Sequence, residues 1–146
     1  MANKAARLLE EEATLAVVRK ADLLLQRVTD VLKPYGLSPT QYNVLRILRG
    51  AGKQGASCGE IGGKLISRDP DVTRMMDRLE KRGLLTRDRA KEDRRVVTHQ
   101  LTAEGLTLVN ELDRPVQQLH RSTLGGISPA KLETLIAILE EMRIED

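Results

Sequence analysis

Apolar positions in the middle of the chain recur with the period of an α-helix. Four of them lie at i, i+3, i+4 and i+7, on one helical face: Val72, Met75, Met76 and Leu79. The spacing predicts a helix capped by Asp69, with Pro70 in its first position and Gly83 at its end. The opposite face is charged, and it carries Asp71, Arg74, Asp77, Arg78 and Lys81.

A β-hairpin is predicted directly after this helix, with strands Leu84–Arg87 and Val96–Leu101. The segment between the strands is rich in basic side chains: Arg89, Lys91, Arg94 and Arg95. Taken alone, each feature also fits a solvated helix or a soluble turn. A second short helix precedes the charged helix, and the three elements in this order indicate a winged helix-turn-helix that binds DNA.

The longest helix is predicted at the start of the chain, over Ala5–Lys33. This segment contains no Gly or Pro, and Pro34 ends it. One apolar face consists of Leu8, Leu15, Val18, Leu25, Val28 and Leu32, and a second consists of Val17, Leu24 and Val31. Two apolar faces predict two buried surfaces, one against the helix's own domain and one against a partner chain.

The next helix begins after a tight turn at Tyr35 and Gly36. Ser38 is its predicted cap, Pro39 occupies its first position, and Gln41 stands at the third position, as in a capping box. We expect its apolar side to face inward and the glycines between 50 and 52 to end it.

A second capping box, formed by Ser57 and Glu60, opens another short helix that reaches about Ile66. Three glycines weaken this helix: Gly59, Gly62 and Gly63. Each costs about 1 kcal/mol relative to alanine. The alternative is that they permit close contact with a neighbouring helix.

Two more helices are predicted after the hairpin. Thr102 caps the first, which reaches about Leu124 and contains Pro115, so we expect a kink or a local loss of hydrogen bonds. Its inner face is predicted to be Leu106, Val109, Leu112, Val116 and Leu119. The last helix begins at Ser128, and its apolar positions are Leu132, Leu135, Ile136, Leu139 and Met142. Amphipathic helices at both chain ends suit an intertwined dimer.

The composition fits one domain of 146 residues with an aliphatic core, because the chain has no Phe, no Trp and two Tyr. So few aromatic residues favour burial of further apolar surface by oligomerisation. A single Cys excludes an intramolecular disulfide framework. No apolar run suits a membrane span or a signal peptide, so we expect a soluble cytoplasmic protein that does not contact a membrane.

Basic charge is concentrated in the first two thirds of the chain. Residues 53–95 carry 12 basic and 8 acidic side chains, whereas residues 96–146 carry 4 basic and 8 acidic ones. The density is highest over 81–95, with 7 basic and 3 acidic residues. We therefore expect the hairpin to face a polyanion and the acidic C-terminal arm to point away from it.

Nearly the whole chain resembles the MarR family of bacterial transcriptional regulators. The similar stretches are LSPTQYNVLRIL, VTRMMDRLEKRGLLTR, DRRVVTHQLTAEG and GISPAKLETLIAILEEM, and Asp93-Arg94-Arg95 matches the family's D-x-R element. The resemblance implies a mainly α protein with a small β-hairpin wing, as one MarR-like domain over 1–146. It also implies a winged helix-turn-helix at about 38–101 and a homodimer formed through about 5–33 and 103–146.

Together with the charge pattern, the resemblance assigns DNA contacts. In the major groove, we expect base contacts from the turn before the charged helix and from its first turns: Arg68, Asp71, Thr73 and Arg74. Arg78 and Lys81 lie further along the helix and are expected to reach phosphate. By resemblance, Arg95 inserts into the minor groove, oriented by Asp93. Arg89, Lys91 and Arg94 are either phosphate contacts or solvated charges.

A dimer with two recognition helices implies double-stranded DNA with a pseudo-palindromic operator, its half-sites about 10 bp apart. The family resemblance also implies repression released by a small aromatic or anionic effector. Candidate lining residues are Arg19, Tyr35 and Tyr42, although both tyrosines fit a plain core equally well. His120 is a further polar candidate. His99 departs from the family, which usually has an aliphatic residue there, and we expect it to be a satisfied strand residue.

Other function classes are less well supported. An oxidant sensor through Cys58 is an alternative, but no second cysteine could resolve an oxidised thiol within the chain. The sequence holds no catalytic set, no clustered metal ligands and no glycine-rich phosphate loop, so we expect neither an enzyme nor a cofactor. A helical adaptor that does not bind DNA would explain the amphipathic ends but not the basic wing.

Overall fold

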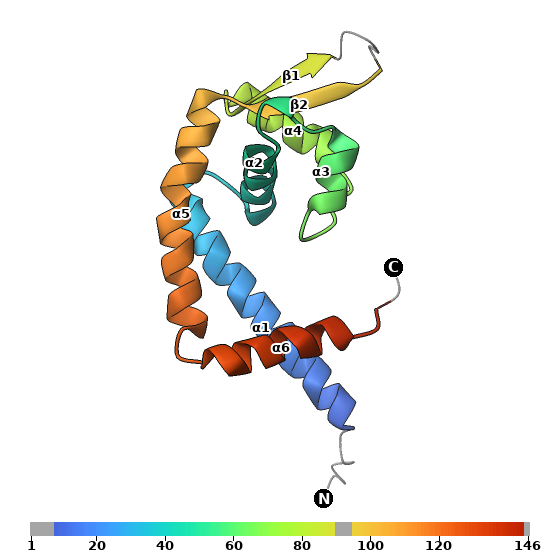
Figure 1. Ribbon diagram of the computed structural model, residues 1–146, viewed down its shortest axis with the longest axis vertical. Coiled ribbons are helices and arrows are strands. Elements are labelled where there is room, and N and C mark those ends of the chain that lie inside the picture. Colours follow the sequence, from blue (N-terminus) through green and yellow to red (C-terminus); the bar gives the residue numbers. More distant parts are fainter. Residues whose placement is uncertain (1–7, 90–94, 145–146) are drawn as a thin grey trace, which may run out of the picture.

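The computed structural model describes residues 8–89 and 95–144. Its helices are α1 (Leu9–Leu32), α2 (Pro39–Ala51), α3 (Cys58–Lys64), α4 (Val72–Lys81), α5 (Ala103–Leu124) and α6 (Pro129–Glu141). Two 3-10 turns follow α1 and α2, η1 (Lys33–Tyr35) and η2 (Gly52–Gln54), and one hairpin consists of β1 (Leu85–Arg89) and β2 (Val97–Leu101). The fold is mainly helical with a small β-hairpin, as expected (Figure 1). Within the described ranges, no helix has the length and apolar character needed to cross a membrane.

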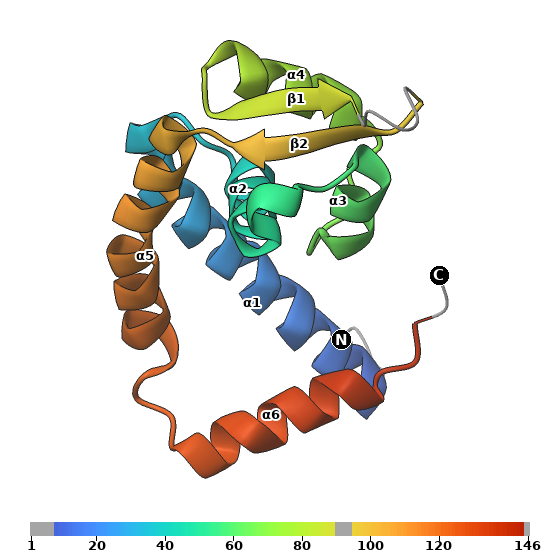
Figure 2. The ribbon, with the colours of Figure 1, turned by 45° about the horizontal axis from the view of Figure 1, so that its top comes forward.

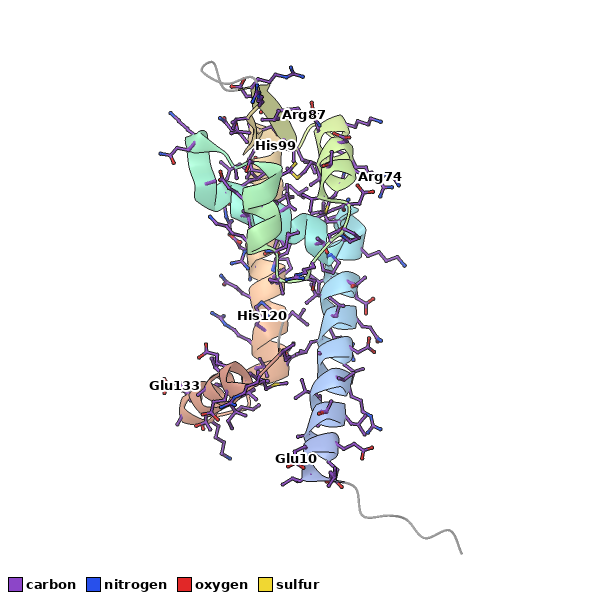
Figure 3. The ribbon with its side chains drawn as sticks, turned by 90° about the vertical axis from the view of Figure 1, so that its right-hand side faces the viewer. Glu10, Arg74, Arg87, His99, His120 and Glu133 are labelled. Carbon is purple, nitrogen blue, oxygen red and sulfur yellow. The ribbon has the colours of Figure 1, made fainter. Side chains whose placement is uncertain are left out.

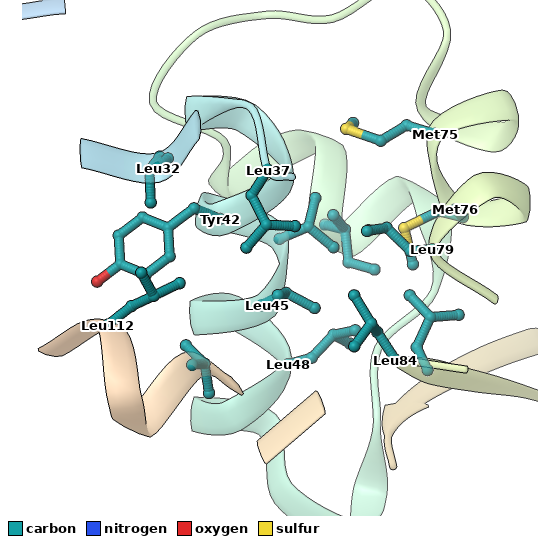
Figure 4. Packing of buried hydrophobic residues seen from close by; sticks show 14 of the residues in the cluster. Leu32, Leu37, Tyr42, Leu45, Leu48, Met75, Met76, Leu79, Leu84 and Leu112 are labelled. Atoms are coloured by element: carbon teal, nitrogen blue, oxygen red, sulfur yellow. The ribbon is translucent and has the colours of Figure 1, made fainter. Parts of the chain in front are cut away.

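The core forms around α2, which packs against α1, α3, α5 and the hairpin. Leu45 and Leu48 of α2 are buried together with Met76 and Leu79 of α4 and Leu112 of α5 (Figure 4). All buried core side chains except Tyr42 are aliphatic, as the composition required. The core therefore fixes α4 through its buried side and leaves the opposite side of that helix in solvent.

The two terminal helices extend well beyond this core. Only the last turns of α1 pack against it, through Val28, Val31 and the fully buried Leu32. The rest of α1 exposes apolar side chains, among them Val18, Leu23 and Leu25. Helix α6 has no buried residue, and Figure 3 shows it standing apart from α1. A single chain thus leaves apolar side chains of α1 and α6 in solvent. We call these two helices the arms.

The hairpin strands pair antiparallel in one register, from Leu85 opposite Leu101 to Arg89 opposite Val97. Ala56, in the loop before α3, adds an isolated bridge to His99 of β2, with backbone hydrogen bonds of 2.8 and 3.0 Å. The strand β1 contacts α4 and β2 contacts α3, so the hairpin spans both short helices (Figure 2). This arrangement fixes the wing relative to the helix-turn-helix.

Several predicted helix ends are confirmed by their hydrogen bonds. Ser38 and Gln41 form the full capping box at the start of α2, with distances of 3.0 and 3.1 Å. Ser57 caps α3 by accepting from the backbone N–H of Glu60 at 3.2 Å. Gly83 has φ +73°, the left-handed conformation that glycine adopts most readily, and it follows the last turn of α4.

The predicted start of α4 is wrong by two residues. Pro70 lies in a turn outside the helix, and the cap is Asp71, whose Oδ1 accepts from the backbone N–H of Arg74 at 3.3 Å. Asp69 instead accepts from the backbone N–H of Asp71 at 2.8 Å and holds the preceding turn. Asp69 therefore stabilises the turn before the helix, and Asp71 caps the helix itself.

The inner face of α5 also differs from the prediction. Leu106 is exposed and Leu119 is half-buried, whereas Gly105 is buried with the expected Val109, Leu112 and Val116. The reason is close contact with the chain after α4, because a Cβ on Gly105 would lie 2.0 Å from the carbonyl oxygen of Leu84. The helix continues through Pro115 without interruption.

Helix α3 is shorter than predicted and ends at Lys64, not Ile66. The side chain of Asn43 on α2 accepts from the backbone N–H of Ile66 at 2.9 Å and draws that residue out of the helix. The glycines of α3 do not serve close packing, since a Cβ on Gly63 would meet nothing within 4 Å. A Cβ on Gly59 or Gly62 would make ordinary contacts at 3.9 Å.

Gly63→Ala should therefore stabilise the protein, because alanine loses less backbone entropy in a helix and meets no obstacle here. We expect the free energy of unfolding to rise by about 0.5–1 kcal/mol. Gly105→Ala is the opposing control and should destabilise the fold, since its Cβ would overlap a backbone carbonyl. Urea denaturation of the three proteins measures both effects. A lower stability for Gly63→Ala would contradict this description of α3.

Candidate nucleic-acid interface

The exposed side of α4 carries the polar side chains expected to contact DNA. Met75, Met76 and Leu79 are buried, so Thr73, Arg74, Arg78 and Lys81 project from the solvent side of the same helix. Arg74 points outward from α4, away from the wing (Figure 3). A rigid helix that is buried on one side can present cations to phosphate and base edges at fixed spacing.

Asp71 has two contacts at the start of α4. One carboxylate oxygen caps the helix, and the other pairs with Nε of Arg74 at 3.2 Å. Both side chains are largely exposed, so the pair adds little stability. Its consequence is geometric, because it restricts the orientation of the Arg74 guanidinium. Asp71 was expected to contact a base, which stays a prediction.

Arg87 joins the wing to α4, a contact that the sequence analysis did not single out. Its guanidinium extends from β1 and pairs with Asp77 and, at 3.5 Å, with Glu80. A sequence signal was available, because Arg87 lies two residues after the buried Leu85 and shares its strand face. The side of the strand that covers α4 therefore carries a cation opposite two carboxylates of that helix.

A groove of about 610 Å³ lies between the start of α3, the helix α4 and the wing. We call it the wing groove, and its lining includes Cys58, Thr73, Arg87, Arg95 and His99. Two expected DNA contacts from distant parts of the sequence, Thr73 and Arg95, thus face the same hollow. The half-buried thiol of Cys58 lies there as well.

A smaller groove of about 270 Å³ lies on the other side of α4, next to the start of α2. We call it the α2 groove, and its lining includes Ser38, Asp71, Arg74 and Arg78. The expected DNA-contacting residues are therefore divided between two hollows that flank α4. This division is compatible with a helix that lies in the major groove with a phosphate strand on each side.

Three further predicted contacts are not part of the lining of either groove. Arg68 is exposed in the turn before α4, Lys81 is exposed at the end of α4, and Arg89 is exposed at the end of β1. Three predicted wing residues lie outside the described part of the chain: Lys91, Asp93 and Arg94. The orientation of Arg95 by Asp93 therefore stays a prediction.

His99 differs from the satisfied strand residue that we expected. Its backbone pairs with Ala56, but its side chain is 2% exposed, and neither ring nitrogen has a hydrogen-bond partner among the described residues. Burial lowers the pKa of the imidazole, and the nearby Arg87 guanidinium lowers it further. The backbone of Ala56 and the carboxylates of Glu80 and Asp77 act in the opposite direction but do not cancel the effect of burial. The neutral ring is therefore the form that fits this site.

The expected effector residues do not all come together. Tyr42 is buried in the core and Tyr35 packs against the same core, where burial raises the pKa of the Tyr42 phenol. Arg19 is exposed on α1, about 20 Å along the helix from its last residue. His120 is exposed on α5.

A polar contact joins α2 to α5 beside Tyr42. Arg49 donates to both carboxylate oxygens of Asp113, at 2.8 and 3.0 Å, and to Asn110 at 2.9 Å. The hydrogen bonds from Arg49 lower the pKa of Asp113.

Across the part of the chain that the structure describes, no group of three His, Cys, Asp or Glu side chains could hold a metal ion.

Comparisons with known proteins identify the family. The sequence model of the MarR family matches residues 37–97. PecS of Dickeya dadantii, an HTH-type transcriptional regulator, is 32% identical over 132 residues, which cover 89% of this chain and 80% of PecS. A MarR transcription factor from Planctomyces limnophilus is 38% identical, with a TM-score of 0.73 and coverage of 93% and 98%. The chain belongs to the MarR family.

A further solved structure agrees over almost the full length. BpsR of Bordetella bronchiseptica has a TM-score of 0.82 and 25% identity, and the match covers 97% of this chain and all of that one. The fold of this MarR-family protein is therefore the winged helix-turn-helix with helical extensions at both ends. It is a DNA-binding transcriptional regulator, as its relatives are.

The burial of His99 predicts a pH dependence of stability. Because the folded-state pKa is below the unfolded value of about 6.5, the unfolded chain binds more protons as the pH falls through that value. The contribution of His99 to the free energy of unfolding is then fully present well above pH 6.5 and is lost as the pH falls below it. His99→Leu should flatten the change in melting temperature between pH 7.5 and 5.5.

The exposed His120 provides the matched control for this experiment. His120→Leu should keep the pH dependence of the wild type, since its ring is in solvent. If His99→Leu and the wild type lose the same melting temperature between these pH values, a neutral buried imidazole at position 99 is refuted.

Proposed function

We propose that this MarR-family protein is a homodimer that binds a pseudo-palindromic operator through α4 and the wing of each protomer. The observation that carries the proposal is the clustering of cations and a hydroxyl around α4, with Arg95 and Thr73 in the wing groove and Arg74 and Arg78 in the α2 groove. Such an arrangement suits a helix in the major groove and a wing at the adjacent minor groove. A cytoplasmic location belongs to the proposal, because its target is DNA.

Within this interface, Arg74 is the proposed base reader and Arg78 and Lys81 are phosphate contacts. The ion pair with Asp71 supports the role of Arg74, because a restricted guanidinium can make two parallel hydrogen bonds to guanine. Arg68 and Thr73 are further candidates for base contacts, and Arg95 is the proposed minor-groove contact. Arg89 and Arg94 complete the proposed contacts from the wing to phosphate, and Asp93 orients Arg95.

We further propose that α1 and α6 form the dimer interface. On α6, the apolar side chains at 135, 136, 138 and 139 are 40–56% exposed. Helix α1 exposes a comparable series from Val17 to Leu25. Surfaces of this kind on a soluble chain are explained by a partner, and a second copy supplies the same two helices.

We also propose a small aromatic or anionic effector that releases the protein, a repressor, from DNA. The relative BpsR supports this, because its DNA binding is regulated by 6-hydroxynicotinic acid. Tyr35 and Tyr42 lie near the junction of α1 with α2, where a bound molecule would contact both the arm and the DNA-binding unit. Arg19 would reach such a molecule only from a partner chain. Titrating 6-hydroxynicotinic acid into the operator complex tests the release.

The dimer is tested by a substitution on α6. Ile136→Glu should shift the protein to a monomer at micromolar concentration, because it buries a charge against apolar side chains in the proposed interface. Ile66→Glu, at an 86% exposed site outside both arms, should leave the mass unchanged. Light scattering gives both masses. A wild-type protein that is a stable folded monomer would refute the dimer.

The interface is tested by comparing a selected operator with a scrambled duplex across a salt series. Arg74→Ala should collapse the ratio of the two affinities, because an arginine–guanine pair contributes about 1–3 kcal/mol of discrimination. Asp71→Asn keeps a helix cap but removes the ion pair, so it should reduce the same ratio less.

Arg95→Ala should weaken binding to all duplexes, most strongly to those with a narrow A·T-rich minor groove.

Equal loss on both duplexes for Arg74→Ala would instead make Arg74 a phosphate contact. The salt slope would then fall by about one unit. No loss on either duplex would mean that α4 does not enter the groove, and the proposed interface would be wrong.

A further inference from the structure

Arg82 directly follows Lys81, the last residue of α4, which is the proposed recognition helix, and its side chain contacts the backbone that follows α1. Arg82 forms the C-terminal cap of α4, one residue before the left-handed Gly83 that leads into the wing. Asp71 and Arg74, at the start of α4, lie about three and about two helical turns before it. Arg82 is therefore in a poor position to read bases.

The guanidinium of Arg82 contacts the backbone that follows α1, at a residue 46 positions earlier in the sequence. Nη1 donates to the carbonyl oxygen of Gly36 at 2.7 Å, and Nη2 donates to that of Tyr35 at 3.1 Å. These are consecutive carbonyls at the end of η1, directly after the long helix α1. Helix ends leave such carbonyls without partners in their own helix, and a cation there is favourable.

The backbone that Arg82 contacts is itself well fixed. Gly36 has φ +67° and donates its N–H to the carbonyl of Lys33 at 3.0 Å, and the buried Leu32 and Leu37 flank the turn. The planar guanidinium bridges two acceptors, which fixes an orientation as well as a distance. The end of the recognition helix is thus tied to the point where the arm α1 enters the domain.

We propose that Arg82 is a positioning residue that sets the angle between α4 and α1, and so the separation of the two recognition helices in the dimer. This rests on the proposed function, because it requires a dimer held through the arms. Two recognition helices must match half-sites about 34–36 Å apart. Because the arms join the two protomers, a change in the α4–α1 angle of each protomer changes that separation.

The proposal is distinct from a phosphate contact by Arg82. A positioning residue affects the preference for half-site spacing and the distance between protomers, and leaves the salt slope of DNA binding unchanged. A phosphate contact lowers the salt slope by about one unit and leaves the spacing preference as it was. The two roles therefore give different results in the same measurements.

The test compares the wild type with Arg82→Ala, Arg82→Lys and the control Arg114→Ala, an exposed arginine of α5 that lines neither groove. Binding is measured on an operator selected from random duplexes, and on versions with one base pair inserted or removed at the centre. Arg82→Ala should bind the selected operator at least about fivefold more weakly and distinguish the three spacings less. Arg114→Ala should behave as the wild type.

A second readout does not use DNA. Cys58 is the only cysteine of the chain, so one spin label on each protomer reports the distance between the two DNA-binding units. Arg82→Ala should broaden or shift that distance distribution, and Arg82→Lys should do so less, because an ammonium keeps the charge but not the planar fork. If Arg82→Ala melts below the assay temperature, the lysine variant provides the same comparison.

The outcomes distinguish a failure of the proposed function from a failure of the positioning role of Arg82. A wild-type protein that binds the selected and scrambled duplexes equally would refute the proposed function. A wild type that discriminates, together with an arginine-82 variant that keeps its spacing preference and distance distribution, would refute the positioning role alone. Loss on all duplexes with a smaller salt slope would make Arg82 a phosphate contact and also overturn the proposal.

Discussion

The packing of α2 against its neighbours is the contact on which each functional surface of this protein depends. Because Leu45 and Leu48 are buried in one cluster with side chains of α4, α5 and the hairpin, those elements have fixed relative positions. A close-packed core tolerates little displacement. The cations of α4 and the wing can therefore meet a DNA surface with a spacing that is set before binding. Preorganisation of this kind reduces the ordering cost of association.

Helix periodicity and capping residues predicted most of the fold, because both depend on neighbours a few positions away. The start of α4 was wrong because Asp69 was taken as the cap, whereas Asp71, two positions later, caps the helix and Asp69 holds the preceding turn. The inner face of α5 was wrong for a different reason. Its orientation follows from Gly105 lying against the Leu84 carbonyl, a contact across 21 positions that no periodicity reveals.

The candidate site was predictable in its residue types and not in its geometry. Arg74 and Arg78 were assigned from their place on the helix opposite the buried methionines, and that face is exposed. Their separation from Thr73 and Arg95 into two grooves depends on where the wing crosses α4. Contacts between different elements accompany this crossing, among them Arg87 of β1 with Asp77 and Glu80 of α4. The isolation of the His99 ring has the same origin, since it follows from tertiary packing.

The same separation of scales bears on regulation. Apolar side chains of α1 and α5, among them Leu32 and Leu112, are part of the buried core. Polar side chains add contacts at the same junctions, because Arg82 bonds the backbone that follows α1 and Arg49 of α2 bonds Asp113 of α5. A hydrogen bond of this kind contributes about 1 kcal/mol, far less than the core as a whole. Loss of one such contact therefore changes the balance between two arm angles by about that amount, while the core keeps the unit folded. A ligand needs only a differential affinity of that size to shift the population between two arm angles. The proposed effector site near Tyr35 lies at one of these junctions, because Arg82 bonds the carbonyl of that residue.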